Sequence, residues 1–270
     1  MYILFDIGAT KTRLALAKDR SHFGEPVIFD TPAVYQSGLK KLIKEIRKLT
    51  PKKVEGIAGG ITGTLNEDRT ELTRSPNLTG WVGGPLEADL HKEFNCPVFI
   101  ENDAAIVGLG EAVAGAGIGD EIVVYITVST GVGGTRIVDG QIDEHAFGFE
   151  PGHELVDMQH SLEDLISGRA VEERFDKKPY EIPQSDPIWD ELAEKLAFGL
   201  HNAIVYWSPD SIVIGGSMIV GDPVIKISDV EKHLKQISKV YPRLPKVKKA
   251  TLGAVGGLHG ALQYLNSRLG

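Results

Sequence analysis

Residues 4–17 read LFDIGATKTRLALA, and residues 125–138 read YITVSTGVGGTRIV. Each stretch consists of an apolar run, a turn rich in Gly and Thr, a Thr-Arg pair and a second apolar run. Two apolar runs joined by a short glycine-containing turn predict a β-hairpin. Because one such hairpin begins each half of the chain, the repeat predicts two similar α/β domains that face each other across a cleft.

The segments that follow each hairpin alternate between helical and extended patterns. Leu39, Leu42 and Ile46 recur at three- and four-residue spacing among lysines, which predicts an amphipathic helix. Short apolar runs that end in Gly or in Asn-Asp predict strands. Further strands are expected near residues 54–58, 97–100, 121–128, 211–214 and 247–252, and further helices near 104–114, 162–175, 188–207, 230–239 and 258–265.

The composition is that of a water-soluble globular protein. Of the 270 residues, 42% are hydrophobic and 24% are charged, which excludes a disordered or fibrous chain. The 37 acidic residues outnumber the 29 basic ones, so a basic face that binds nucleic acid is not expected. No apolar run approaches the roughly 18 residues of a membrane span, and no secretion signal is recognisable. A cytoplasmic protein without a membrane partner is therefore expected.

The turn of the first hairpin, residues 6–12, has the residue types of a phosphate-binding site. Glycine lets backbone amides approach an anion closely, and Thr hydroxyls and Lys11 add further donors. Asp6, at the end of the strand, can hold Mg²⁺ directly or through water. Residues 129–134 repeat the pattern in the second hairpin. Each turn alone is equally consistent with a structural role, whereas two of them favour a triphosphate held by one turn from each domain.

Two further polar motifs could carry chemistry. Glu101-Asn102-Asp103 lies where a strand ends and a helix begins, and Asn and Asp are preferred helix caps. The alternative is a catalytic carboxylate, since ligands of α/β sheets bind at the carboxyl ends of strands. Residues 150–153, EPGH, are either a surface turn or a Glu and a His that bind hydroxyl groups. His145, His153 and His160 match no standard zinc spacing.

Together these motifs resemble those of the ROK group of sugar kinases and sugar-responsive repressors. SPNLTGW at residues 75–81 is similar to the sugar-side loop of the group, and ENDA at residues 101–104 is identified with its catalytic motif. Seven short motifs occur in the order of the family, which makes the resemblance specific. The other five are DIGATKTR (6–13), GIAGGITG (56–63), STGVGG (129–134), EPGH (150–153) and IVIGGS (212–217).

The resemblance implies a two-domain α/β protein with the actin-like ATPase fold, which is ribonuclease H-like, and an interdomain cleft. Residues 1–106 with 256–270 would form the small domain, and residues 107–255 the large one. The implied reaction transfers the γ-phosphoryl group of ATP, with Mg²⁺, to a hexose hydroxyl. Glucose, at its 6-OH, is favoured over fructose, N-acetylmannosamine and N-acetylglucosamine. The family often dimerises, and a homodimer is open for this chain.

The resemblance also implies roles for single residues. Asp103 would accept the proton of the sugar hydroxyl, and Asp6 would position Mg²⁺. The nucleotide would be held by Asp6, Gly8, Ala9, Thr10, Lys11, Thr12, Thr130, Gly131, Gly133, Gly134, Gly215 and Gly216. The sugar would be held by Gly60, Asn77, Asn102, Asp103, Glu150, His153 and Glu163.

The segment after EPGH departs from the family pattern. Most members have a zinc loop with three cysteines there, whereas residues 154–161 of this chain read ELVDMQHS and its only cysteine is Cys96. The flanking His153 and Leu162-Glu163 are retained. We therefore expect no zinc site, and His153 keeps only the sugar role.

Two other classes of function are open alternatives. One is a sugar-binding regulator without catalysis, because the family includes repressors. These carry an N-terminal helix-turn-helix, which is not expected where a strand begins at residue 2. The other is an actin-like ATPase that serves assembly, in which case SPNLTGW and EPGH would have no sugar to bind. Both rank below the sugar kinase.

Overall fold

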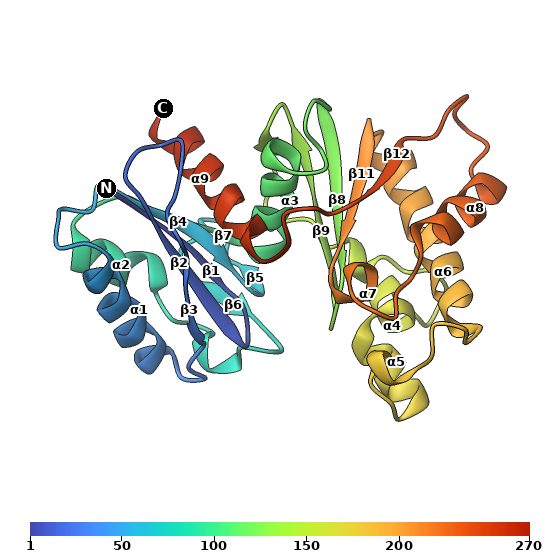
Figure 1. Ribbon diagram of the computed structural model, residues 1–270, viewed down its shortest axis with the longest axis horizontal. Coiled ribbons are helices and arrows are strands. Elements are labelled where there is room, and N and C mark those ends of the chain that lie inside the picture. Colours follow the sequence, from blue (N-terminus) through green and yellow to red (C-terminus); the bar gives the residue numbers. More distant parts are fainter. The chain divides into compact units, whose positions relative to one another are not determined.

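A computed structural model describes residues 1–270, and the chain forms two units. Unit 1 consists of Met1–Val113, Glu144–Gly148 and Gly253–Gly270, and unit 2 consists of Ala114–Asp143 and Phe149–Leu252. Each unit contains one five-stranded sheet, and both are drawn in Figure 1. None of the helices combines the length and the apolar character needed to cross a membrane.

The sheet of unit 1 has the strand order β3-β2-β1-β4-β7. Strand β1 (Tyr2–Ile7) pairs antiparallel with β2 (Lys11–Ala17), which forms the first predicted hairpin, and β3 (Val27–Asp30) extends it. Strands β4 (Gly56–Ile61) and β7 (Val98–Asn102) run parallel to β1. The carboxyl ends of β1, β4 and β7 therefore lie along one edge of the sheet.

Helices cover both faces of this sheet (Figure 1). On one face, α1 (Tyr35–Leu49) and α2 (Leu86–Phe94) form a hydrophobic core with the alternate β1 residues, which include Phe5. Leu4 and Asp6 lie at the intervening positions of β1. Helix α9 (Gly256–Leu269) packs on β1 and β4. The other elements of the unit are β5 (Thr64–Leu65), β6 (Leu72–Arg74), η1 (Thr79–Trp81), α3 (Asp103–Ala114) and η4 (Gly253–Val255).

Helices α3 and α9 approach each other at glycines. A Cβ atom on Gly260 would lie 1.7 Å from the carbonyl oxygen of Ile106, and one on Gly110 would lie 2.2 Å from that of Gly256. Both distances are shorter than any van der Waals contact, so the helices can pack this closely only because these side chains are absent. This contact fixes α3, which begins with Asp103.

We expect Gly260→Ala to destabilise unit 1, because the added methyl group must displace the backbone of α3. Overpacking of this kind costs about 1–3 kcal/mol. Urea denaturation would measure the change in the free energy of unfolding. Gly24→Ala is the control, since its Cβ would lie 3.6 Å from the Leu16 carbonyl oxygen, an ordinary contact. Equal stability of the two variants would contradict the close packing of α3 and α9.

The sheet of unit 2 has the order β10-β9-β8-β11-β12. Strand β8 (Ile122–Val128) pairs antiparallel with β9 (Val132–Val138), which forms the second predicted hairpin. Strands β11 (Ser211–Gly215) and β12 (Lys246–Lys249) run parallel to β8, and β10 (Gln141–Ile142) lies at the other edge. As in unit 1, the first strand of an antiparallel hairpin is followed across the sheet by two strands that run parallel to it.

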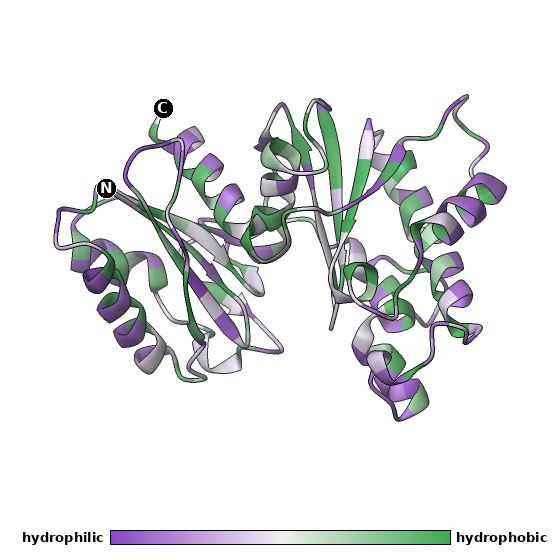
Figure 2. Cartoon of the chain, viewed as in Figure 1, coloured by the Kyte–Doolittle hydropathy of each residue, from purple (hydrophilic) through white to green (hydrophobic).

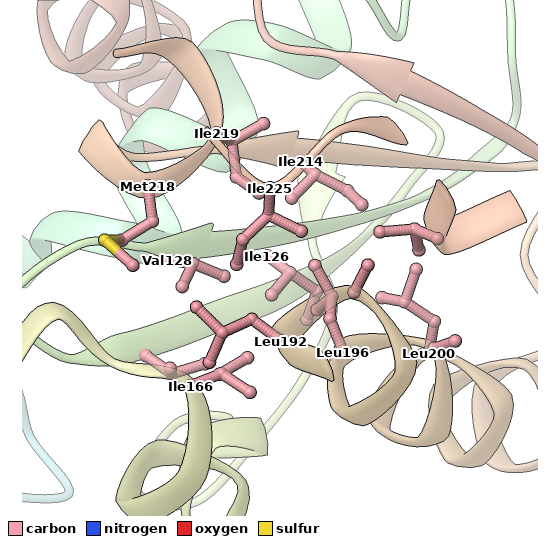
Figure 3. Close-up of a cluster of buried hydrophobic side chains, with 14 of the residues drawn as sticks. Ile126, Val128, Ile166, Leu192, Leu196, Leu200, Ile214, Met218, Ile219 and Ile225 are labelled. Atoms are coloured by element: carbon pink, nitrogen blue, oxygen red, sulfur yellow. The ribbon is translucent and has the colours of Figure 1, made fainter. Parts of the chain in front are cut away.

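The core of unit 2 lies between this sheet and its helices. Figure 3 shows Ile126 and Ile214 from the sheet facing Leu192, Leu196 and Leu200 of α6 (Ile188–Trp207). Figure 2 shows the hydrophobic character of β8 and β11 and the mixed character of the helices. The other elements are η2 (Pro151–His153), α4 (Leu162–Ile166), α5 (Gly168–Phe175), η3 (Pro179–Glu181), α7 (Ser217–Val220) and α8 (Ile227–Ile237).

Candidate active site

Two carboxylates lie at the carboxyl edge of the unit 1 sheet. The strand register aligns Asp6 of β1 with Gly60 of β4, and Gly60 with Glu101 of β7. Two residues beyond Glu101, Asp103 begins α3. Because the parallel strands all end here, the edge brings together Asp6, the turn at Gly8, Gly60 and the Asn102-Asp103 pair.

Asp103 is held at the strand-helix junction by its neighbours. Its Oδ1 accepts a hydrogen bond from the Ala104 amide at 2.9 Å, and Asn102 Oδ1 caps the helix by accepting one from the Ala105 amide at 3.1 Å. Asn102 Nδ2 also donates to the Gly63 carbonyl at 2.9 Å. A Cβ on Gly60 would lie 3.0 Å from the Asp103 Cα, so glycine keeps this approach open.

The pKa of Asp103 is raised to about 6 by burial and by the negative charge of Asp6. Asp6 is 8% exposed, and burial raises its pKa as well, against the attraction of Arg13, whose Nη1 lies 3.3 Å from Oδ2. A Cβ on Gly257 would lie 2.9 Å from the Asp6 Cγ, so α9 begins directly over this carboxylate. An aspartate with a pKa near 6 is a better proton acceptor than an ordinary one, and it is still ionised at neutral pH.

The first Gly/Thr turn uses several of its polar groups internally. The Gly8 amide donates to the Lys11 carbonyl at 3.0 Å, and the buried Thr12 hydroxyl bonds that of Thr31 at 2.9 Å. Lys11 Nζ lies 2.5 Å from Asp30 Oδ1, with both side chains largely exposed. Ala9 and Thr10 form the accessible tip of the turn.

A buried ion cluster at the Glu101-Asn102-Asp103 motif was not predicted from the sequence. Arg69 Nε donates to Glu101 Oε2 at 2.8 Å, and its Nη2 donates to the His145 carbonyl at 3.1 Å. His145 Nε2 lies 3.8 Å from the same Glu101 oxygen, and Glu101 Oε1 accepts the Asn102 amide at 2.9 Å. Burial alone would raise the pKa of Glu101, but the hydrogen bonds and the charge of Arg69 hold it below its ordinary value. The cluster thus joins the motif to the Glu144–Gly148 segment.

The SPNLTGW segment is anchored by its apolar residues. Leu78 is 3% exposed and Trp81 is 2% exposed, and the Trp81 indole N–H donates to the Pro32 carbonyl at 2.8 Å. Asn77 lies between buried Ser75 and Leu78 with its own side chain exposed. Leu78 and Trp81 therefore anchor the loop, and the Asn77 side chain extends from it into solvent.

In unit 2, the second Gly/Thr turn and the Gly215-Gly216 pair meet at one edge of the sheet. Gly216 has φ = 88°, and a Cβ there would lie 2.2 Å from the Val128 carbonyl oxygen at the end of β8. The hydroxyls of Ser129 and Ser217 are 3.0 Å apart. A cavity of about 300 Å³ opens beside the turn, with Ser129, Thr130, Gly168, Arg169, Lys178 and Tyr180 among its lining residues. Its position next to Thr130 and Gly131 suits a ligand that carries phosphate groups.

The EPGH segment packs on the second hairpin. A Cβ on Gly152 would lie 2.1 Å from the Val132 carbonyl oxygen, and one on Gly134 would lie 2.8 Å from the Pro151 ring. These glycines seat η2 against β9, next to Gly133, and leave Glu150 and His153 exposed. Glu163, in contrast, turns toward the Gly/Thr turn, where its Oε2 accepts the Val132 amide at 2.7 Å.

The shortened loop after EPGH is held by hydrogen bonds. The Val156 amide donates to the His160 carbonyl at 2.9 Å and the Leu162 amide to the Glu154 carbonyl at 3.0 Å, which closes the loop as a small bridge. Asp157 accepts from the His160 amide at 2.8 Å, and Ser161 and Asp164 form a capping box. Without thiolates, the loop lacks the soft donors of the family's zinc site.

We expect a strong zinc chelator to leave both the melting temperature and the activity unchanged. The contacts within residues 154–164 connect the loop without metal, so no folding free energy should be lost on chelation. Thermal denaturation with and without chelator measures this, and metal analysis of the purified protein is the control. Stoichiometric zinc that is removed together with activity would contradict the expectation.

Comparison with known proteins supplies the family. The ROK family model matches residues 2–268. The chain belongs to the ROK family. Among solved ROK structures, the hexokinase of Thermus thermophilus superimposes with a TM-score of 0.86 at 25% identity, covering 100% of this chain and 99% of that one. The glucokinase of Streptomyces griseus, in complex with glucose and AMPPNP, gives 0.80 at 23% identity, covering 98% and 99%. The fold is therefore the α/β actin-like ATPase fold of ROK kinases.

Curated relatives of this ROK protein differ in what they act on. The N-acetyl-D-glucosamine kinase of Yersinia pseudotuberculosis is 28% identical over 97% of both chains. The fructokinase of Lactococcus lactis subsp. cremoris is 26% identical over 93% of this chain and 94% of its own. The xylose repressor of Caldicellulosiruptor bescii is 27% identical over 72% of this chain and 61% of its own. Family membership alone therefore does not select one sugar.

Proposed function

We propose that this chain is an ATP-dependent hexose kinase that transfers the γ-phosphoryl group to the 6-OH of glucose. The observation that carries the proposal is the pair of carboxylates, Asp6 and Asp103, at the edge where β1, β4 and β7 end. A regulator that only binds sugar needs no proton acceptor at this place, whereas a kinase does. The names of the relatives, which include kinases for several hexoses, support the reaction class.

In the proposed mechanism, Asp103 accepts the proton of the attacking sugar hydroxyl. Asn102 bonds the Ala105 amide just after Asp103 and the Gly63 carbonyl of a neighbouring segment, so the carboxylate keeps its direction while the sugar binds. Because its pKa is raised to about 6, the carboxylate is ionised at pH 7 and takes the proton more readily than an ordinary Asp. Orientation is the larger contribution, since phosphoryl transfer depends chiefly on alignment and charge neutralisation.

The residues at this edge fit the Mg²⁺ ion that accompanies ATP. Asp6 is a buried carboxylate whose one cationic partner lies at the long distance of 3.3 Å, and carboxylate oxygen is the donor that Mg²⁺ prefers. Asp6 would hold the ion directly or through water. The ion would neutralise charge on the transferred phosphoryl group.

We assign the nucleotide to the cavity of unit 2, where the turn at residues 129–134 and Gly215-Gly216 would hold phosphate and nucleoside. Within unit 1, the tip of the first turn is a proposed phosphate contact. The proposed sugar contacts of unit 1 are Gly60, Asn77, Asn102 and Asp103, and those of unit 2 are Glu150, His153 and Glu163.

The proposal is tested by ADP release coupled to a spectroscopic readout, with ATP, Mg²⁺ and a panel of hexoses. Glucose is expected to give the largest kcat/KM, with fructose, N-acetylmannosamine and N-acetylglucosamine as competitors. A larger kcat/KM for another hexose would make that hexose the proposed substrate in place of glucose, and the kinase reaction would stand. ADP release that is the same with and without any sugar would favour the assembly ATPase instead.

A further inference from the structure

The hairpin of β5 and β6 is bonded to two successive residues of the Glu101-Asn102-Asp103 motif. Just before β5, the Gly63 carbonyl accepts a hydrogen bond from Asn102 Nδ2 at 2.9 Å. In the turn between the two strands, Arg69 Nε donates to Glu101 Oε2 at 2.8 Å. Both bonds hold the end of β7, so they act directly before the point where Asp103 begins α3.

The turn that carries Arg69 is itself held by Asn66. The Asn66 Oδ1 accepts the Thr70 amide at 2.8 Å and the Glu71 amide at 3.3 Å, and its Nδ2 donates to the Thr70 hydroxyl at 2.8 Å. The Arg69 amide donates to the Asn66 carbonyl at 3.0 Å, and Arg69 has φ = 57°. A residue with a Cβ keeps this conformation only where its surroundings fix it, so the turn presents the guanidinium from one place.

Glu101 transmits this restraint to the backbone of the motif. Its Oε2 is bound by Arg69, while its Oε1 accepts the Asn102 amide at 2.9 Å. The Glu101 side chain is only 4% exposed, and buried ion pairs contribute little net stability when compared with apolar side chains of similar volume. The charge at position 101 therefore calls for a use beyond packing, and the bond to the Asn102 amide supplies one.

Arg69 supplies the permanent positive charge of this cluster. Its Nη2 donates to the His145 carbonyl at 3.1 Å, so both ends of the guanidinium have a partner. On the side of α9, burial and the charge of Glu101 raise the pKa of Tyr264, so that its phenol stays neutral. A planar guanidinium can bond two partners in fixed directions, whereas a lysine ammonium offers only a point charge.

We propose that Arg69 is a positioning residue for the reaction, which acts through Glu101 to hold the Asn102-Asp103 backbone in the direction that proton transfer requires. The inference rests on the proposed kinase function and adds a residue that lies outside every motif of the family resemblance. Direction matters here because a misplacement of about 1 Å at a reacting group can lower the rate about 10²-fold.

The test compares full-length Arg69→Met, Arg69→Lys and Glu101→Gln with the wild type. Steady-state kinetics are measured with ATP, Mg²⁺ and the hexose that gives the wild type its largest kcat/KM. We expect Arg69→Met and Glu101→Gln each to lower kcat at least about tenfold, while the KM values for ATP and sugar change less than about threefold. The KM values should persist because Asn77 and the cavity of unit 2 are not part of the cluster. Arg69→Lys should recover part of kcat, since it restores the charge but not the planar geometry.

Leu42→Ala separates lost positioning from lost stability. Leu42 is 1% exposed in the core that α1 forms with the sheet, so its truncation weakens folding without touching the cluster. Urea denaturation of each variant measures stability and sets a temperature at which all of them are folded in the assay. At that temperature Leu42→Ala should keep the wild-type kcat. If kcat fell no further in Arg69→Met and Glu101→Gln than in Leu42→Ala, the positioning role would be overturned and the kinase would stand.

The double variant Arg69→Met with Glu101→Gln tests the route of the effect. If Arg69 acts through Glu101, the double variant should have a kcat little below that of the lower single variant. Losses that multiply would overturn the route through Glu101. If the wild type formed no ADP with any hexose, the proposed function would fall, and the inference with it.

Discussion

Asp103→Asn is expected to lower kcat by about 10²–10⁴-fold, the usual cost of removing a general base. The amide has the size and shape of the carboxylate but cannot accept the proton. Sugar binding should persist, because Asn102 and the glycine at position 60 still fix the backbone. Steady-state kinetics with glucose and ATP measure the loss.

The same substitution is expected to stabilise the protein. The folded-state pKa of Asp103, about 6, lies above the ordinary value of 3.8, so the folded state binds the proton more tightly than the unfolded state does. Ionisation therefore opposes folding, and stability falls as the pH rises from about 4 to 6, by up to about 3 kcal/mol. Asp103→Asn removes this cost, so the melting temperature at pH 7 should rise while activity is lost. In the wild type, kcat should fall below about pH 6, where the base is protonated.

The control for both effects is Asp229→Asn, which alters another carboxylate in the first turn of a helix, α8. It should leave kcat unchanged and should not raise the melting temperature. Near-normal turnover of Asp103→Asn would reduce Asp103 to a helix cap, which is the structural alternative that its position also allows.

Arg69→Met is expected to cost about 3–5 kcal/mol of folding free energy, because it leaves the buried charge of Glu101 without its closest cation. The Glu101 side chain is 4% exposed and that of Arg69 is 23% exposed, so water cannot replace the lost guanidinium. Arg69 also has φ = 57°, a left-handed conformation that residues with a Cβ adopt reluctantly. Its bonds to Glu101 and His145 offset that strain.

Urea denaturation measures this loss, and Arg174→Met is the matched control. Arg174 binds Glu191 across an exposed surface, where an ion pair contributes about 0–1 kcal/mol. Equal stability of the two variants would mean that the Arg69 cluster contributes no more than a surface pair.

The sequence predicts the parts of this molecule that depend on local order along the chain. Both hairpins, the strands expected near residues 54–58 and 97–100 and the helix expected near 104–114 follow from alternation, glycine turns and capping residues. The structure places these elements at Gly56–Ile61, Val98–Asn102 and Asp103–Ala114. Their meeting at one sheet edge follows from the parallel pairing of β1, β4 and β7, which the structure supplies, whereas the roles of Asp6 and Asp103 are implied by the family resemblance.

The remaining features depend on contacts that no local pattern encodes. Arg69 reaches Glu101 across 32 positions and His145 across 76, so nothing near Arg69 in the sequence marks it. The direction of the Glu163 side chain is set by Val132 and Arg169, and a motif specifies a residue but not the way its side chain turns. The glycine contact of α3 with α9 joins segments from opposite ends of the chain.

The most direct test of the central proposal is to follow the γ-phosphoryl group itself. The protein is incubated with γ-labelled ATP, Mg²⁺ and glucose, the products are separated, and Asp103→Asn serves as the inactive control. We predict that the label appears in glucose 6-phosphate, in an amount that matches the ADP formed, and that the control forms about 10²–10⁴-fold less. Label found only in inorganic phosphate, at a rate that no hexose changes, would contradict the account.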